Sequence, residues 1–403
     1  MLPLTVQKQK VVVIGHSTTL RLSIVRAVAE LGCEITVVVL GRRSLLRKLK
    51  SPKPYDCYSK YVSRVLFCQP SKDTLIQLLL DKCTDAEQKV ILLPTSDFSA
   101  VAIDDNKERL DRYFAFPHIA DTSKSVHYWM NKEWQKDVAR EVGLNVPNSR
   151  TVEIQNSAYS IPEGIEYPCF TKALVTLVGA KSCFSRCNNE ADLKAALDAI
   201  AVRGDVKVLV EDFKEIDTEY AVLGFSDSDE VVIPAIVQIV KMSASHFGVA
   251  MTGKIIPTAG FEPQIEQFKA FVRRIGFVGV FDIDFYYSGG KYYFGEMNLR
   301  PGGSGYAITK LGVNLPGMLV RHLRGESTVE MNRQITATAT FVNERMCEDD
   351  WYQGHISSSE YRNVLSAADI SFVFDEQDPK PQQVFARLHI INPVEKHLRK
   401  ILR

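Results

Sequence analysis

The chain has 403 residues, 45% of them hydrophobic and 24% charged, with a formal net charge of +1 at pH 7. A chain of this length is expected to form two or three packed units rather than one. The balanced charge gives no general attraction to nucleic acid, no apolar run reaches the roughly 18 residues that a membrane-spanning helix needs, and the N-terminus has no apolar signal core. We therefore expect a cytoplasmic globular protein with no nucleic-acid partner and no transmembrane segment.

Cysteine usage gives the same expectation about the compartment. Eight cysteines are scattered along the chain, and only Cys183 and Cys187 lie close together. No second pair and no histidine stands at the spacing of zinc ligands, so free thiols in a reducing compartment are favoured over a zinc site.

The first elements predict a parallel α/β unit. Residues 11–14 form an apolar run ending at Gly15, a helical stripe of apolar residues follows, and residues 34–40 form a second β-rich run. This β-α-β order favours a parallel sheet with right-handed crossovers. A buried-type strand at 90–93 is followed by Asp97, where open α/β sheets hold ligands, although a helix cap is the commoner role for such an acid. Gly15 does not begin a complete G-x-G-x-x-G motif, which disfavours NAD binding.

The character of the sequence changes near residue 120. Residues 131–149 read as an amphipathic helix followed by an extended segment. From 167 to about 290 the signals are mainly β, with one clear helix among them. After Gly325 short mixed elements lead to a basic helix at 393–403, for which a solvated helix is favoured over a membrane-surface contact.

The segment YYFGEMNLRPGGSG, residues 292–305, carries the clearest chemical signal. Side chains alternate along a strand, so Tyr292, Phe294, Glu296 and Asn298 are expected to share one face. A strand that enters a glycine-rich turn is usually only structural. Here, however, an acid and an amide are expected to point the same way.

The preceding strand adds carboxylates to this face. Asp282 and Asp284 are two positions apart on one strand, so their side chains are expected to share a face. Ser288–Gly290 predicts a hairpin turn after this strand. A three-residue loop would put Asp284 on the same side as Glu296, whereas a two-residue loop would put them on opposite sides. We favour the first, because carboxylates that point together repel each other unless a hard cation such as Mg²⁺ binds them. Asp284, Glu296 and Asn298 are the predicted ligands of Mg²⁺, or of Mn²⁺.

Cationic groups suited to phosphate complete the pattern. Arg300 follows the predicted metal strand, and Pro301–Gly305 can present backbone N–H groups to an anion or oxyanion. Lys172 and Lys181 lie in or near β segments and are candidate phosphate ligands, although Lys172 could instead be a strand-edge lysine with a solvated head. Residues 248–254 have the glycine and lysine spacing of a P-loop, but an isoleucine follows where Ser or Thr is required, so we interpret the match as a coincidence.

Together these ordered motifs resemble the ATP-grasp superfamily, and within it the carboxylate–amine ligases similar to D-aspartate ligase and the carbamoyl-phosphate-synthetase-like proteins. The resemblance covers roughly residues 10–325. It implies mixed α/β and α+β architecture, with an ATP-grasp fold and an N-terminal Rossmann-like preATP-grasp domain. The implied domains are a preATP-grasp domain at 1–120, an ATP-grasp domain at 121–325 with a small lid at about 150–212 and a large subdomain at about 213–325, and a C-terminal α+β segment at 326–403.

The resemblance also assigns roles to individual residues. The implied phosphate-binding lysines are Lys132, Lys172 and Lys181. The implied nucleoside-binding residues are Glu211 for the adenine amino group, Asp212 and Phe213 for the ring edge, and Glu219 for the ribose. The implied catalytic residues are Arg300 and Lys172, and the groups facing the substrate or its oxyanion are Arg300, Gly302, Gly303 and Ser304. A lone histidine, His246, could lie near the phosphates, although a core or surface position is the commoner outcome.

The function that this resemblance implies is an ATP- and Mg²⁺-dependent ligase. Such an enzyme activates a carboxylate as an acylphosphate and joins it to an amine, and its partners are small molecules: an amino acid, a peptide or a cell-envelope precursor. A bicarbonate-activating enzyme of the carboxylase or carbamoyl-phosphate synthetase type, and a non-catalytic ATP-binding regulatory protein, are the alternatives. The resemblance also implies a homodimer, which no surface pattern in the sequence tests.

Overall fold

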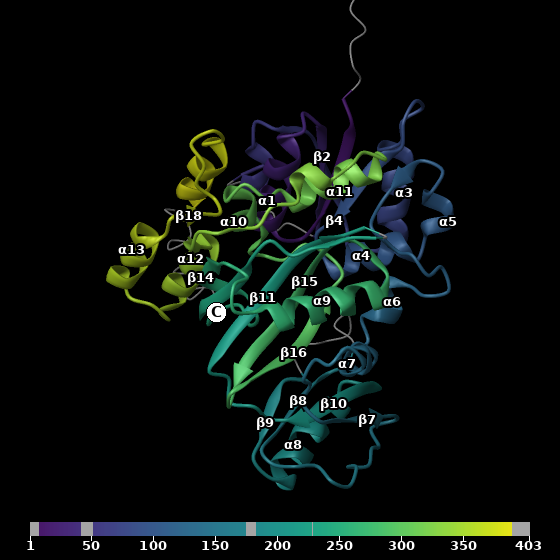
Figure 1. Cartoon of the computed structure of the whole chain (residues 1–403), viewed down its shortest axis with the longest axis vertical. Coiled ribbons are helices and arrows are strands. Elements are labelled where there is room, and N and C mark those ends of the chain that lie inside the picture. The colour runs from purple at the N-terminus through teal and green to yellow at the C-terminus, as the bar shows by residue number, and fades with distance from the viewer. Residues whose placement is uncertain (1–7, 42–50, 175–182, 228, 389–403) are drawn as a thin grey trace, which may run out of the picture.

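The computed structural model describes residues 8–41, 51–174, 183–227 and 229–388 (Figure 1). Lys181 and the basic helix expected at 393–403 lie outside these residues. Within the described part of the chain, no helix combines the length and the apolar composition needed to cross a membrane. None of the eight cysteines, all of which lie among the described residues, forms a disulfide.

The N-terminal unit is a five-stranded sheet in the order β3-β2-β1-β4-β5, and all its neighbouring strands are parallel, which confirms the predicted β-α-β opening. Alternate residues of β1 pack on opposite faces: Val11 and Val13 contact the core around α1, whereas Val12 and Ile14 contact the core around α3 and α4. The elements are β1 (Lys10–Gly15), α1 (Thr18–Ala29), β2 (Glu34–Leu40), η1 (Tyr55–Tyr58), β3 (Val62–Cys68), α3 (Lys72–Lys82), β4 (Val90–Pro94), α4 (Asp97–Asp104), α5 (Lys107–Leu110) and β5 (Phe114–Ala115).

A four-stranded antiparallel sheet forms a separate small unit, at the bottom of Figure 1. Its strand order is β7-β10-β8-β9, and α8 packs against one face to form a core of its own. The elements of this part of the chain are α6 (Val126–Trp129), α7 (Lys132–Glu141), β7 (Ser149–Ile154), β8 (Cys169–Ala173), β9 (Ser185–Cys187), α8 (Glu190–Ala201) and β10 (Val206–Asp212).

The largest sheet has nine strands, with the main order β16-β15-β11-β13-β14-β17-β18. One face packs on α9, and the other packs on α10, α11 and α1, so the same core joins this sheet to the N-terminal unit. The strands are β6 (His118–Ile119), β11 (Thr218–Ser226), β12 (Val231–Val232), β13 (Ile236–Met242), β14 (Ala250–Ile256), β15 (Phe277–Ser288), β16 (Lys291–Asn298), β17 (Ala339–Val342) and β18 (Ile370–Ser371). The helices are α9 (Glu262–Ile275), α10 (Gly305–Lys310), α11 (Leu315–Leu323), η3 (Val329–Met331), α12 (Glu344–Gln353) and α13 (Ser358–Ala367).

The turn between β15 and β16 corrects one step of the sequence interpretation. Ser288 pairs with Lys291, so the loop has two residues and not the three that we expected. A β-bulge then shifts the register between Asp284 and Phe285, and Asp284 pairs directly with Glu296. The expected juxtaposition of the two acids is therefore confirmed, but the bulge produces it and not the loop length.

The bulge also changes which side chains share a face. Tyr292 and Phe294 pack with the α9 core, whereas Glu296 and Asn298 line the opposite side, so the expected common face of these four residues is wrong. Gly295 lies at the bulge, where a Cβ atom would come within 2.9 Å of the Asp284 carbonyl oxygen. The glycine therefore permits the close approach that the bulge requires.

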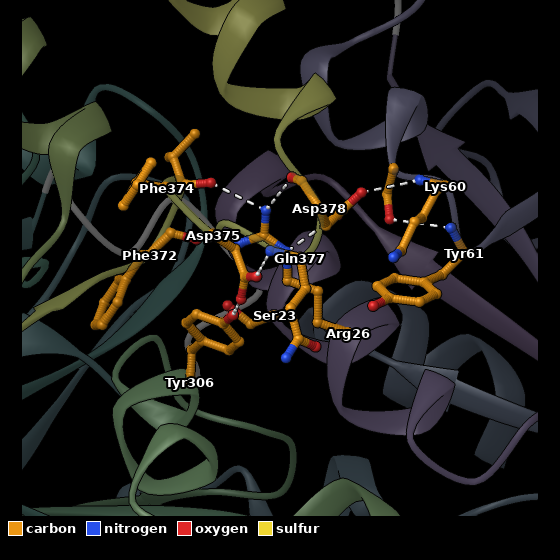
Figure 2. A network of polar contacts seen from close by, with 12 residues as sticks. Ser23, Arg26, Lys60, Tyr61, Tyr306, Phe372, Phe374, Asp375, Gln377 and Asp378 are labelled. Carbon is orange, nitrogen blue, oxygen red and sulfur yellow. Dashed lines mark hydrogen bonds and ion pairs between the residues drawn. The ribbon is translucent and has the colours of Figure 1, made fainter.

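The C-terminal residues are integrated into the large sheet and the N-terminal unit. Strands β17 and β18 extend the sheet beyond β14. Figure 2 shows Arg26 of α1 among residues of the 372–378 segment, beside Tyr306 of α10. Its guanidinium donates to the carbonyl oxygens of Phe372 (3.2 Å), Val373 (3.0 Å) and Asp378 (3.1 Å), and Nε lies 3.1 Å from the Asp378 carboxylate. This contact holds the C-terminal segment against α1.

Candidate functional site

A cavity of about 1890 Å³ lies where the three sheets meet, and C-terminal residues also line it. It brings together residues from β8, β10, β11, β15 and β16 with the start of α7. The predicted site residues that line it are Lys132, Lys172, Glu211, Asp212, Phe213, Glu219, Asp284, Glu296, Asn298, Arg300, Gly303 and Ser304. Gly302 is not among the lining residues: it lies behind the cavity surface, where a Cβ atom would come within 2.5 Å of the Asp282 carboxylate.

Three carboxylates and one amide form the acidic part of the cavity. The Asn298 side-chain amide donates to Asp284 at 3.5 Å. The side chain of Asp284 is exposed to the cavity, but the surrounding protein displaces much of the water around it, and this desolvation, together with the charges of Asp282 and Glu296, raises the pKa of Asp284 well above its ordinary value. Burial also raises the pKa of Asp282 to about 6, although the nearby Arg300 opposes the shift. The two aspartates therefore lack sufficient positive charge around them.

Glu296 differs from the two aspartates because a lysine neutralises it. Burial alone would raise the pKa of Glu296, but an ion pair with Lys132 and the charges of Lys172 and Arg300 lower it. Lys132 is the first residue of α7, whose N-cap is Asn131, and it is 6% exposed. The helix start thus places an ammonium directly on the predicted metal strand.

Arg300 bridges the metal strand and the N-terminal unit. Its Nε lies 2.8 Å from Asp97, and its Nη2 donates to the Asn298 side-chain oxygen at 3.1 Å. Burial disfavours the charged guanidinium, but the charges of Asp97 and Asp282 outweigh that effect and raise the pKa of Arg300. The cap of α4 is Ser96, so the expected cap role of Asp97 is wrong and its carboxylate serves the site instead.

A second charged group lies between the small sheet and α7. Lys172 pairs with Glu211 at 2.6 Å and is only 15% exposed, and Lys136 pairs with the other carboxylate oxygen of Glu211. Strand β8 is interior to its sheet, so the alternative of a strand-edge lysine with a solvated head is wrong. Burial, with the neighbouring charge of Lys172, lowers the pKa of Lys136 to about 8 in spite of its ion pair. One carboxylate thus serves two lysines.

The end of β10 supplies the remaining predicted groups. Phe213 follows this strand, and its N–H donates to the Pro168 carbonyl at 3.0 Å. Glu219 lies near the start of β11, opposite Tyr286, and burial raises the pKa of its carboxyl group. Because the Phe213 N–H is already engaged, any ligand at this edge must use other backbone groups nearby.

The donor atoms of the acidic cluster suit a hard divalent cation. Among the described residues, no group of three or more His, Cys, Asp and Glu side chains is already arranged as a metal site. The raised pKa values of Asp282 and Asp284 nevertheless show carboxylates in need of positive charge. Oxygen ligands of this kind are those that Mg²⁺ prefers. The residues present therefore fit the ion that the sequence implied.

Three residues that belong to these charged groups were not assigned to the site from the sequence: Asp97, Asp282 and Lys136. Asp282 was visible as the strand-face partner of Asp284, and it lines the same cavity close enough for its charge to act on Asp284. Lys136 follows Lys132 by one helical turn, a spacing that puts two side chains on one face. Asp97 had the right position after a strand, but its partner Arg300 is distant in the sequence.

A family model and the architecture agree on the fold. Residues 137–314 match the family model of the ATP-grasp domain. The mixed architecture, with a parallel N-terminal sheet and two antiparallel sheets around one cavity, is that of the ATP-grasp fold.

Solved structures of similar fold include ligases and synthetases. The L-amino acid ligase of Bacillus licheniformis superposes with a TM-score of 0.59 at 17% identity, covering 83% of this chain and 80% of that one. N5-carboxyaminoimidazole synthetase of Staphylococcus aureus superposes with a TM-score of 0.62 at 14% identity, covering 87% of this chain and 86% of that one. At these identities the likeness shows the fold.

Curated relatives resemble the chain over about half its length. The carbamoyl phosphate synthase large chain of Gemmatimonas aurantiaca is 28% identical over 199 residues, 48% of this chain and 18% of that protein. The formate-dependent phosphoribosylglycinamide formyltransferase of Anaeromyxobacter dehalogenans is 23% identical over 222 residues, 54% of this chain and 57% of that protein. The chain thus matches less than two thirds of either relative.

Proposed function

We propose that the protein is an ATP- and Mg²⁺-dependent ligase that activates a carboxylate as an acylphosphate and joins it to an amine. The observation that carries this proposal is the single cavity in which Asp284, Glu296 and Asn298 lie with Arg300 and the two lysines Lys132 and Lys172. A carboxylate cluster beside several cations suits a nucleotide triphosphate with its metal, and the relatives named above include ligases and synthetases.

The nucleotide would bind between the small sheet and the large one. Lys132 and Lys172 would hold phosphate oxygens and exchange their present carboxylate partners for the nucleotide. Glu211 has lone pairs left to accept from the adenine amino group, since a carboxylate offers about four acceptor positions. The backbone carbonyl of Asp212 and the N–H of Lys214 would meet the ring edge, and Glu219 would accept from the ribose hydroxyls.

Asp284, Glu296 and Asn298 would hold Mg²⁺, with Asp282 beside them. When bound, Mg²⁺ would neutralise the phosphate charge and the carboxylate cluster. Arg300 would stabilise charge on the transferring phosphoryl group, and the N–H groups of Gly303 and Ser304 would face the oxyanion that forms when the amine attacks. Positioning the attacking carboxylate in line with the transferred phosphoryl group supplies a large part of the rate acceleration in such reactions.

The decisive experiment measures ADP release with amino acids and other small carboxylates and amines offered in pairs, with mass spectrometry of the products. We expect Mg²⁺-dependent ADP release that needs both an acid and an amine, and an amide product. ADP release with bicarbonate alone would favour the carboxylase alternative. Tight ATP binding with no ADP from any pair, or with bicarbonate, would favour a non-catalytic nucleotide-binding protein.

Replacement of Arg300 tests its assigned role. Arg300→Ala is expected to lower kcat by about 10²–10³-fold and to leave most of the ATP affinity, because the guanidinium acts on charge that develops during phosphoryl transfer. Initial rates and nucleotide titration measure the two effects. Arg274→Ala, an arginine that is 65% exposed on α9, is the control for loss of a surface charge. A near-normal kcat for Arg300→Ala would exclude this role.

A further inference from the structure

The first residue of α4, Asp97, joins the N-terminal unit to the strand of predicted metal ligands. Its carboxylate accepts from Nε of Arg300 at 2.8 Å, and the two side chains are 19% and 21% exposed. Both line the large cavity, and Asp97 also borders a small void together with Glu296 and Asn298. Asp97 lies outside residues 137–314, which match the family model, so that match assigns it no role.

The backbone that carries Asp97 is fixed on both sides. The N–H and the hydroxyl of Thr95 donate to the Ile14 carbonyl at 2.8 and 3.1 Å, which ties the end of β4 to the end of β1. Ser96 caps α4, and Ser99 forms a reciprocal capping box with it. The cap therefore does not need the Asp97 carboxylate, and the positive end of the helix dipole favours its negative charge. Asp97 is thus an anion held on a rigid turn.

Arg300 lies between this anion and the aspartates of the acidic cluster (Asp282, Asp284, Glu296 and Asn298). Among the described residues, Asp97 is the one carboxylate that forms an ion pair with Arg300. Asp282 and Asp284 form no such pair, yet both lie close enough for their negative charges to act on the guanidinium. Opposite charges attract, so the guanidinium is drawn toward the acidic cluster as well. A guanidinium that moved there would neutralise the carboxylates in place of a divalent cation.

The hydrogen bonds of Arg300 leave donors for a ligand. A guanidinium has five N–H groups. In the described contacts, Nε donates to Asp97, Nη2 to the Asn298 side-chain oxygen at 3.1 Å and Nη1 to the Pro301 carbonyl at 3.2 Å. One N–H on each terminal nitrogen therefore remains for the transferred phosphoryl group. Because Asn298 is also a predicted metal ligand, its oxygen would be shared with the cation, and the ion pair with Asp97 would become the main restraint on the guanidinium.

We infer that Asp97 is a positioning residue, which holds Arg300 beside the acidic cluster and keeps it from occupying the cluster. The ion pair leaves Asp282 and Asp284 without a guanidinium partner, so they stay available to a divalent cation. It also fixes the guanidinium that acts on the phosphoryl group, so the N-terminal unit takes part in the catalytic centre. This inference rests on the proposed function, because it takes the acidic cluster as the site of Mg²⁺.

The test measures cation binding and not turnover. Mn²⁺, which also suits carboxylate oxygens, is titrated into the full-length protein without nucleotide, and the electron paramagnetic resonance signal of free Mn²⁺ reports the bound fraction. Asp97→Asn keeps the size of the side chain and removes its charge. We expect it to weaken Mn²⁺ binding at least about tenfold, a difference of about 1.4 kcal/mol, because the released guanidinium neutralises the acidic cluster.

A second background shows whether Asp97 acts through Arg300. In Arg300→Met no guanidinium competes with the cation, so the further change Asp97→Asn should alter the affinity for Mn²⁺ by less than about twofold. An equal loss in both backgrounds would mean that Asp97 binds the cation itself, and it would overturn the positioning role.

The matched control is Asp73→Asn. Asp73 is an exposed acid in the first turn of α3, in the same N-terminal unit, and a serine also caps that helix. This variant should bind Mn²⁺ like the unaltered protein, because its carboxylate is not paired with Arg300. Urea unfolding shows whether each variant is folded. If Asp97→Asn is not, Asp97→Ser, which keeps an oxygen acceptor for Arg300 without the charge, takes its place with the same expected loss.

Two other results would contradict the positioning role: normal Mn²⁺ binding by folded Asp97→Asn, and an equal loss in Asp73→Asn, which would indicate a long-range effect of charge. Either result in a protein that releases ADP as proposed would leave the proposed function intact. The expected pattern of Mn²⁺ binding without ADP release from any pair of substrates would do the reverse. Unaltered protein that binds no Mn²⁺ would contradict both, because both need a cation at the acidic cluster.

Discussion

At the scale of single residues, the charges of the site depend on neighbours that are remote in the sequence. Glu211 serves both Lys136 and Lys172, so this group carries one positive charge more than its carboxylate can balance. This excess of positive charge suits a site that binds phosphate. It also disfavours the protonated form of the more deeply buried lysine, Lys136, whose pKa is lowered to about 8 chiefly by burial.

This shift predicts a dependence of stability on pH. Between pH 8 and about 10.4, the ordinary lysine pKa, the unfolded chain keeps a proton at Lys136 that the folded protein has released. The free energy of unfolding of the unaltered protein should therefore rise with pH in this window relative to that of Lys136→Met, by at most about 3 kcal/mol. Urea unfolding from pH 7.5 to 10 measures the difference.

The control for this prediction is Lys194→Met, which removes a lysine that is 63% exposed. Its difference from the unaltered protein should not change over the same pH range. A difference for Lys136→Met that stays constant or falls with pH would show that the buried lysine keeps its proton throughout.

At the scale of elements, the β15–β16 hairpin decides whether the site can form. Its two-residue turn would put Asp284 and Glu296 on opposite faces if the strands paired regularly. The bulge at Gly295 reverses this, and it simultaneously directs Phe294 into the core. One irregular position in the hairpin thus satisfies both the packing of the core and the chemistry of the cavity.

Gly295→Ala is expected to disturb both the packing of the core and the arrangement of the cavity. Its new Cβ atom would lie 2.9 Å from the Asp284 carbonyl oxygen, a backbone atom that cannot move aside cheaply. We expect a loss of about 1–3 kcal/mol in the free energy of unfolding, together with reduced ADP release. Gly303→Ala, where no atom lies within 4 Å of the added Cβ, is the stability control and should change the free energy by less than about 0.5 kcal/mol. Equal stability of the two variants would mean that the bulge does not depend on glycine.

At the scale of the whole molecule, the C-terminal segment connects the units that surround the cavity. The buried pair of Arg26 and Asp378 joins α1 to this segment, and Asp378 also accepts from the backbone N–H of Lys60 at 2.9 Å (Figure 2). Tyr306, in the helix that follows the glycine-rich loop, contacts Asp375 of the same segment. The segment therefore contacts both the N-terminal unit and α10, the helix that follows the loop beside Arg300.

A double-mutant cycle tests this connection. Arg26→Met leaves the Asp378 charge buried without its partner and is expected to cost about 3–5 kcal/mol of unfolding free energy. Asp378→Asn should cost a similar amount, and the double variant should lose about 0.5–3 kcal/mol less than the sum of the two. Urea unfolding of the three variants measures the coupling. Strictly additive losses would show that the two side chains do not interact in solution.

Local patterns determined a large part of this molecule from the sequence alone. The stripe of apolar residues predicted α1, and Gly143 and Gly276 follow the ends of α7 and α9 with the positive φ angles that favour glycine there. The spacing of Asp284, Glu296 and Asn298 and the following Arg300 indicated the chemistry of the site. These features depend on residues a few positions apart, where periodicity and turn chemistry act directly.

Only the tertiary structure decided which charged side chains of the site pair with one another. The contact of Arg300 with Asp97 spans 203 positions, and that of Lys136 with Glu211 spans 75. The Gly295 bulge is a compromise between the α9 core and the cavity, which no regular alternation of strand residues reveals. Local spacing therefore showed which groups the site contains. Which of them are paired, buried or left without a partner depended on how distant elements pack, because burial and long-range contacts set those properties.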